Sequence, residues 1–200
     1  MLKYEKIVNK KKELFAFEVL IQDAFRLQWD RMNINSLNNL TLVQIDAVLN
    51  LSKLKDDIVF CKKYFINMER KQLLNEEFIQ VVSEKCKHAY ERGFKIYFEL
   101  TERDSSTISL EQMKYFKDRY KLKLIADDVE LNDIRWPEIE LGLYEFIKME
   151  KIPSTAYEKN ILSKKRFEGE LIIERIEEKT EFNKAINSEL YSYFQGYLFK

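Results

Sequence analysis

Residues 95–102 read KIYFELTE, and this stretch is the clearest sign of the fold. Its apolar residues form a short, nearly continuous β-type run, as is typical of a parallel strand covered on both faces. Glu99 stands inside the run and Glu102 follows it. A carboxylate in a buried strand is costly unless it is paired, hydrogen-bonded or bound to a cation. The stretch therefore predicts a buried strand with a polar site at its carboxyl end.

Seven further β-type runs are spread along the chain. They are Tyr4–Val8, Phe15–Ile21, Tyr64–Asn67, Leu122–Ala126, Tyr144–Met149, Glu170–Glu174 and, more weakly, Tyr193–Leu198. Helical patterns separate most of them, so the sequence predicts an α/β fold, an irregular (β/α)8 TIM-like barrel more than an open sheet. The segment from Asn9 to Leu14 is too short for a crossover helix, so the first two runs should pair as a hairpin.

Three patterns predict where helices begin and end. Gly93 stands where a helix C-cap belongs, Ser109 and Gln112 resemble a capping box, and Thr180 is the expected N-cap of a later helix. The apolar face expected before Gly93 consists of Phe78, Val81, Val82, Cys86 and Ala89.

Composition excludes several classes of site. The 200 residues carry 34 basic and 34 acidic side chains, so no net field favours DNA or an anionic membrane. Four scattered glycines exclude a P-loop and a dinucleotide fingerprint, and His88 alone excludes a multi-histidine metal site. Two cysteines, no signal peptide and no apolar stretch long enough to span a bilayer predict a cytoplasmic protein. Without a linker, one domain over residues 1–200 is expected.

Polar side chains recur at the carboxyl ends of the predicted strands. Because those ends converge on one face of a barrel, these side chains predict a common site. Carboxylate and amide oxygens suit Mg²⁺ or Mn²⁺ and metal-assisted phosphoester hydrolysis. The alternative is a polar rim of the barrel with no ion. The residues concerned are Glu18, Asn67, Glu99, Glu102, Asp127, Asp128, Lys148 and Glu174.

The same residues resemble a known family. Glu18-Val-Leu20 is similar to the Glu-x-Leu signature of EAL domains, the phosphodiesterases of cyclic di-GMP, and further motifs follow in the family's order. They are Phe65-Ile-Asn67, Glu99-Leu-Thr-Glu102, Asp127-Asp128, Ile147-Lys148-Met-Glu150, Ile173-Glu174-Arg-Ile-Glu177 and Gln195-Gly196-Tyr197. These motifs span nearly the whole chain, so it resembles a divergent, short EAL domain.

The resemblance implies an irregular (β/α)8 barrel with two divalent ions, Mg²⁺ or Mn²⁺, that hydrolyses cyclic di-GMP to linear pGpG. It implies that Lys148 and Glu174 serve the attacking water, and that Leu20, Gln22 and Gln195 lie at the substrate. The implied metal ligands are Glu18, Asn67, Glu99, Asp127 and Asp128.

Three positions depart from the family pattern. Gln22 replaces an Arg that reaches substrate phosphate, and Gln offers a hydrogen bond without charge. The loop after Asp128 runs from Val129 to Asn132 without the family's glycines, and Arg175 replaces another glycine. Glycine is the residue that adopts positive φ cheaply. Two functions stay open: a weak phosphodiesterase, or an inert domain that binds cyclic di-GMP or a regulatory protein partner. A homodimer is a further expectation.

Some charged residues are expected to play lesser roles. Glu102 would brace the loop after the fourth strand, as the resemblance implies. Glu130, Asp133 and Glu177 are expected to be solvated, and His88 to be exposed on a charged helix. For Lys148, an internal ion pair with one of the carboxylates is the alternative to a catalytic role.

Overall fold

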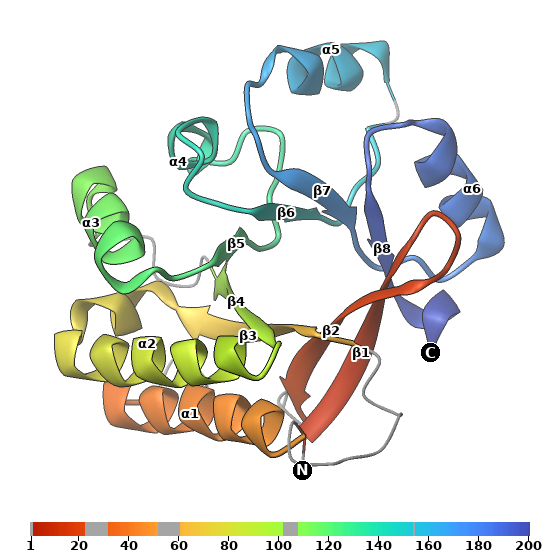
Figure 1. The fold of residues 1–200 in the computed structure, drawn as a ribbon. Coiled ribbons are helices and arrows are strands. Elements are labelled where there is room, and N and C mark those ends of the chain that lie inside the picture. Colours follow the sequence, from red (N-terminus) through yellow and green to blue (C-terminus); the bar gives the residue numbers. More distant parts are fainter. Residues whose placement is uncertain (1, 23–31, 52–60, 102–107, 154) are drawn as a thin grey trace. The chain divides into compact units, whose positions relative to one another are not determined.

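Eight β-strands are found in the part of the chain that the structure, a computed structural model, describes: residues 2–22, 32–51, 61–101, 108–153 and 155–200. Each strand overlaps a predicted run, and hydrogen bonding joins them in chain order into a closed barrel (Figure 1). The predicted TIM-like barrel is therefore confirmed. The strands are β1 (Leu2–Asn9), β2 (Leu14–Ile21), β3 (Lys63–Glu69), β4 (Lys95–Thr101), β5 (Leu124–Ala126), β6 (Phe146–Met149), β7 (Glu170–Ile173) and β8 (Tyr193–Gln195).

The start of the barrel is irregular. A short turn joins β1 to β2, its neighbour in the barrel, and within the turn the Asn9 amide donates to the Glu13 carbonyl over 3.0 Å. β1 pairs antiparallel with β8, with Ile7 opposite Gln195, whereas β2–β3, β3–β4, β5–β6, β6–β7 and β7–β8 pair parallel. The expected hairpin start is therefore present.

Six α-helices lie in the described residues. The predicted capping box of Ser109 and Gln112 opens α3. The N-cap of α6 is Glu178 and not Thr180, because Glu178 forms the capping box with Glu181. None of the described helices has the length and apolar character needed to cross a bilayer. The helices are α1 (Ile34–Leu51), α2 (Glu76–Glu91), α3 (Leu110–Tyr120), α4 (Trp136–Glu140), α5 (Ala156–Lys164) and α6 (Lys179–Asn187).

The chain forms two compact units. Unit 1 comprises residues 1–5 and Ala16–Lys123, and unit 2 comprises Lys6–Phe15 and Leu124–Lys200. Such a division suits one domain or two, so the single domain expected over residues 1–200 stays a prediction.

The core of unit 1 lies between its strands and two helices. Figure 1 shows α1 and α2 beside β3 and β4, and Ile45 and Val48 of α1 and Ile79 of α2 are fully buried. Val82 and Ala89 of α2 are buried as predicted, but Val81 is exposed because it lies at the edge of that helix face. His88 is exposed, as expected.

The core of unit 2 is built from the apolar positions of its short strands. The buried side chains include Ile125, Ile147, Ile172 and Phe194, one from each of four neighbouring strands. The residues directly after β5, β6 and β7 are Asp127, Glu150 and Glu174, so charged groups lie at the carboxyl ends of these strands.

Candidate metal site

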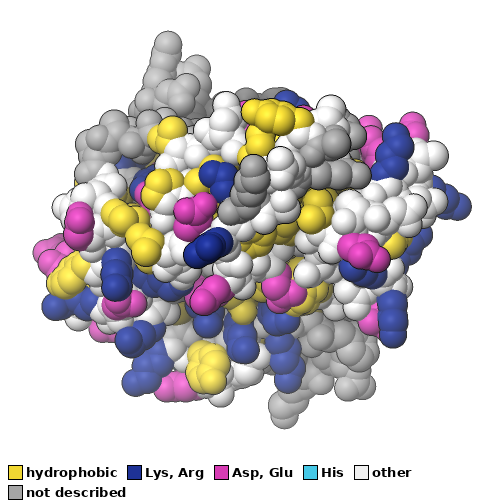
Figure 2. Space-filling view, turned by 90° about the horizontal axis from the view of Figure 1, so that it is seen from above, with side chains coloured by type: hydrophobic (Ala, Val, Ile, Leu, Met, Phe, Trp, Pro, Cys, Tyr) yellow, Lys and Arg dark blue, Asp and Glu magenta, His cyan; other side chains and the backbone are white. Residues whose placement is uncertain are grey.

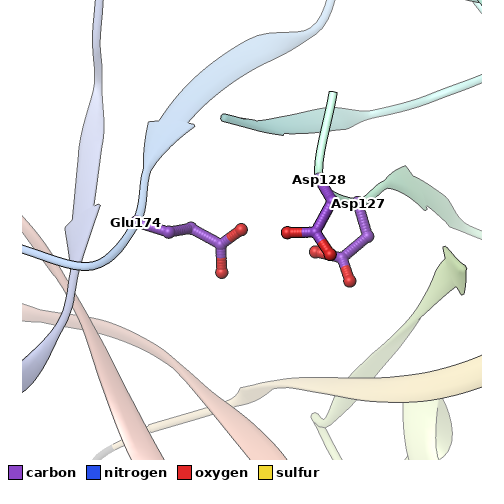
Figure 3. A group of neighbouring side chains, drawn as sticks. All are labelled: Asp127, Asp128 and Glu174. Carbon is purple, nitrogen blue, oxygen red and sulfur yellow. The ribbon is translucent and has the colours of Figure 1, made fainter. Parts of the chain in front are cut away.

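Three carboxylates meet at strand ends in unit 2. Asp127 and Asp128 directly follow β5, and Glu174 directly follows β7. Each offers an oxygen that lies within 4.8 Å of the others, and Figure 3 shows the three side chains turned toward one another. Because Mg²⁺ and Mn²⁺ favour carboxylate oxygens, this donor set fits a hard divalent cation.

Lys148 lies on β6, the strand between β5 and β7, and its side chain is only 1% exposed. Its Nζ is 3.2 Å from Asp127 Oδ1 and 2.7 Å from Glu174 Oε1. A buried ammonium is tolerable only where its charge is compensated, and here two carboxylates compensate it. The structure thus places Lys148 in an internal ion pair with two of the predicted site residues.

Glu150 and Arg175 form the outer edge of this group. Burial is the largest cause that raises the pKa of the Glu150 carboxyl, and a hydrogen bond and charge repulsion from Asp128 raise it further. The Arg175 guanidinium, which pairs with Glu150, lowers this pKa. Asp128 and Arg175 adopt left-handed backbone with φ of 52° and 54°. Of these two, only Arg175 stands where the resemblance predicts a glycine, and it adopts this conformation at a cost of about 1 kcal/mol.

Arg135 anchors the loop that follows β5. Its guanidinium donates to the Asp127 carbonyl over 2.6 Å and to Asp133 Oδ2 over 2.7 Å. The side chains of Arg135 and Asp133 are each only 2% exposed. Asp133 was expected to be solvated, and this expectation is wrong because Arg135 folds back onto it. The only advance sign is the spacing of an acid two residues before an arginine.

Two further contacts fix the same loop. The amide of Val129 donates to the Lys148 carbonyl over 2.8 Å, which ties the loop to β6. The indole of Trp136 donates to the Glu130 carbonyl over 3.0 Å. Together with Arg135, these bonds define the conformation of a loop that contains no glycine.

Gln195 is buried at the end of β8. Its carbonyl accepts a hydrogen bond from the Ile176 amide over 3.0 Å, and the following Gly196 has φ of 149°. A Cβ at Gly196 would lie 2.3 Å from the Ile176 backbone. The Gln-Gly pair therefore lets β8 approach the segment just after Glu174 closely.

A second acidic cluster lies in unit 1. Glu18 on β2, Asn67 on β3 and Glu99 on β4 come from three parallel, adjacent strands, and Asn67 stands opposite Glu99 in the register. The Asn67 amide donates to Glu18 Oε1 over 3.2 Å, and Glu99 is fully buried. The structure brings these three predicted residues to the same edge of the unit 1 strands.

Buried amides that the sequence analysis missed support this edge. Gln44 of α1 donates to the Val19 carbonyl over 2.5 Å, next to Glu18. Gln72 donates to Asn38 and Thr41, each over 3.1 Å, and accepts from the Glu69 amide. In the sequence, these glutamines look like residues of the protein surface. Only their burial in the folded unit shows that they support the site.

No family model and no curated protein matches the sequence. The solved structure of Bacillus subtilis YkuI, which has an EAL domain and was solved in complex with substrate c-di-GMP and calcium, matches with a TM-score of 0.72 and 18% identity. The match covers 98% of this chain and 53% of that one, so this chain spans about half of YkuI.

Two further solved structures agree. The EAL domain of Mycobacterium smegmatis DcpA matches with a TM-score of 0.76 and 16% identity over 100% of this chain and 91% of that one. Vibrio cholerae LapD, a GGDEF-EAL protein bound to c-di-GMP, matches with a TM-score of 0.76 and 14% identity over 100% of this chain and 53% of that one. The fold is that of EAL domains.

Within this EAL fold, the remaining predicted residues lie on or just after β2, or beyond the described residues. Leu20 is half-buried on β2, and Gln22 is exposed just after it. Glu102 lies outside the described residues. Their roles at a substrate or in a loop stay predictions.

Proposed function

We propose that this chain is a cyclic di-GMP signalling domain that binds Mg²⁺ or Mn²⁺ and hydrolyses cyclic di-GMP to linear pGpG, with low activity. The observation that carries the proposal is the group of Asp127, Asp128 and Glu174, whose ligand oxygens lie within 4.8 Å of one another. The c-di-GMP complexes of proteins with the same fold support the choice of ligand. The chain's zero net charge also argues against DNA as the partner.

In this proposal, Asp127, Asp128 and Glu174 hold a divalent ion. When bound, such an ion polarises a phosphoryl oxygen and lowers the pKa of water. The ammonium of Lys148 keeps Asp127 and Glu174 oriented and adds positive charge beside the place where a phosphate would lie. Glu18, Asn67 and Glu99 stay proposed as metal ligands, and Gln22, Leu20 and Gln195 as substrate contacts.

A receptor without turnover is the second candidate, and Gln22 favours it. The side chain is exposed after β2 and is neutral, so it offers a phosphate no charge-assisted hydrogen bond. The loop after β5 is fixed by Arg135 and Trp136, which leaves little freedom for rearrangement around a substrate. A cytoplasmic location, a homodimer and a protein partner stay proposals.

The test is a turnover assay on the purified chain with cyclic di-GMP and Mn²⁺ or Mg²⁺, with linear pGpG quantified by chromatography. We expect slow product formation in the wild type and at least about a hundredfold less with Glu174→Gln, because a metal ligand is lost. Glu168→Gln changes an exposed glutamate of the same unit and is the matched control. Binding of cyclic di-GMP without turnover would support the receptor, and absence of both would contradict both candidates.

A further inference from the structure

A cavity of about 310 Å³ in unit 1 has none of the residues of the acidic clusters in its lining. Its walls come from α2, the start of β4 and residues 120–123, which begin at the last residue of α3. Phe94, Ile96 and Leu122 are buried apolar residues in its lining. The cavity therefore offers an apolar surface of the size that takes a small ligand.

The charge of this cavity is one-sided. Lys87, Lys95, Lys121 and Lys123 line it, and none of the described residues in the lining is an aspartate or glutamate. The chain as a whole has equal numbers of basic and acidic residues, and Figure 2 shows both signs interspersed over the face in view. Four lysines without a carboxylate therefore depart from the chain's balance and favour an anion.

The lysines are not required to satisfy the ends of the adjoining helices. The amide of Gly93 donates to the Tyr90 carbonyl and that of Phe94 to the Ala89 carbonyl, each over 2.9 Å. The Ser83 hydroxyl donates to the Tyr120 carbonyl, also over 2.9 Å. Because these carbonyl groups already have donors, they do not compete with an anion for the ammonium groups. The contact of Lys123 is with the Tyr97 ring, whose centroid is 5.7 Å from Nζ.

An aromatic side chain stands at the same cavity. Tyr90 is 64% exposed although it borders apolar lining, and no ring in the described part of the chain packs on it. The other tyrosine of the lining, Tyr120, stacks with Phe116 and donates its hydroxyl to Glu76 over 2.6 Å. Tyr90 is thus the ring on which a planar ligand can stack.

We infer that this cavity binds a small aromatic anion of the size of a nucleoside monophosphate, with the ring against Tyr90 and the anionic group among the lysines. A volume of about 310 Å³ is at the lower end of the range for ligand sites and suits one base with one phosphate more than a cyclic dinucleotide. The inference does not depend on the proposed phosphodiesterase activity.

The test titrates the whole chain with guanosine 5′-monophosphate by calorimetry, in the presence of a chelator so that the candidate metal site does not contribute. We expect binding in the wild type, about tenfold weaker binding after Tyr90→Ser and at least as large a loss after the double change Lys87→Gln and Lys121→Gln. All the changed side chains are exposed, so thermal unfolding should be unaltered. Tyr157→Ser and Lys179→Gln change exposed residues elsewhere and should leave affinity unchanged.

Separate titrations with inorganic phosphate and with guanosine measure the contributions of the anionic group and of ring stacking to the affinity. Each should bind more weakly than the nucleotide. Absence of nucleotide binding at millimolar concentration would overturn the inference. So would equal losses in the control variants, or phosphate binding as tightly as the nucleotide. None of these results bears on turnover of cyclic di-GMP, which is measured with metal present.

Discussion

The two units stabilise carboxylates at their strand ends by different means. In unit 1, Glu18 accepts a hydrogen bond from the neutral amide of Asn67 over 3.2 Å. In unit 2, the ammonium of Lys148 lies 3.2 Å from Asp127 and 2.7 Å from Glu174. An amide orients a carboxylate but leaves its charge in place, whereas an ammonium compensates it.

The two clusters should therefore differ in how strongly a bound divalent cation stabilises them. Two carboxylates of unit 2 have a counter-charge of their own in Lys148. A divalent ion that enters there must share Asp127 and Glu174 with Lys148, so Lys148 should weaken its binding. Removing individual partners measures this difference directly.

The largest effect is expected from Lys148→Met. The change leaves Asp127 and Glu174 together without their buried counter-charge, and loss of one partner of such a pair costs about 3 kcal/mol or more of unfolding free energy. Urea unfolding measures it, with Lys151→Met, at an exposed neighbour, as control. Mn²⁺ should restore more stability to Lys148→Met than it adds to the wild type. Equal stability of the two variants would contradict the proposed compensation.

Arg135→Met should come next, at about 2–3 kcal/mol. It removes the partner of the buried Asp133 carboxylate and one donor to the Asp127 carbonyl. Adding Asp133→Asn should recover part of the loss, because the charge without a partner is then removed as well. The exposed Arg166→Met is the control. An unfolding free energy like that of the control would show that this pair does not hold the loop.

Asn67→Ala tests the unit 1 cluster and should cost less than Lys148→Met. One hydrogen bond to a carboxylate is lost, which is worth about 1.5–2 kcal/mol. A double-mutant cycle with Glu18→Gln isolates the pair by urea unfolding. A loss as large as that of Lys148→Met would remove the contrast between the two units.

The Cys86 thiol provides a test by pH. Burial raises its pKa from about 9 to about 12, so the folded chain keeps the thiol neutral while the unfolded chain ionises it. The contribution of the neutral thiol to the free energy of unfolding is intact below pH 9 and is lost as pH rises from 9 toward 12. The loss between pH 9 and 10 is about 1 kcal/mol. The difference between wild type and Cys86→Ala in urea unfolding across that range measures it. A difference that does not change with pH would contradict the burial of this thiol.

The smallest effect is expected from Arg175→Gly. Glycine adopts the observed φ of 54° without strain, which should raise stability by up to about 1 kcal/mol. The lost pair with Glu150 involves a mostly exposed arginine and subtracts little. Thermal unfolding with Arg175→Ala as the matched variant separates the two contributions, since alanine removes the pair but keeps the strain. If Gly and Ala are alike, backbone strain is not the cause.

The sequence predicted the strands well because buried parallel strands are short apolar runs with abrupt polar ends. It also predicted polar residues at the strand ends, and the ends of β5 and β7 bring Asp127, Asp128 and Glu174 together. The single common site expected for all the strand-end residues stays a prediction. Prediction from sequence failed where a choice between near neighbours decides the outcome. Thr180 and Glu178 can both cap α6, and Glu178 is used because Glu181 completes its capping box. Asp133 is buried only because Arg135 turns back onto it, which no periodicity indicates.

Gly196 has a structural role in the motif Gln195-Gly196-Tyr197. Any side chain there would meet the Ile176 backbone at 2.3 Å, while the next residue, Tyr197, is two-thirds exposed. Under random mutagenesis, the glycine should therefore tolerate no replacement, whereas Tyr197 should accept many. Selection for folding alone would preserve this glycine in a chain that had lost all activity. Its persistence in a lineage thus reports the architecture of the barrel, and only the side chain of Gln195 beside it can report on a ligand.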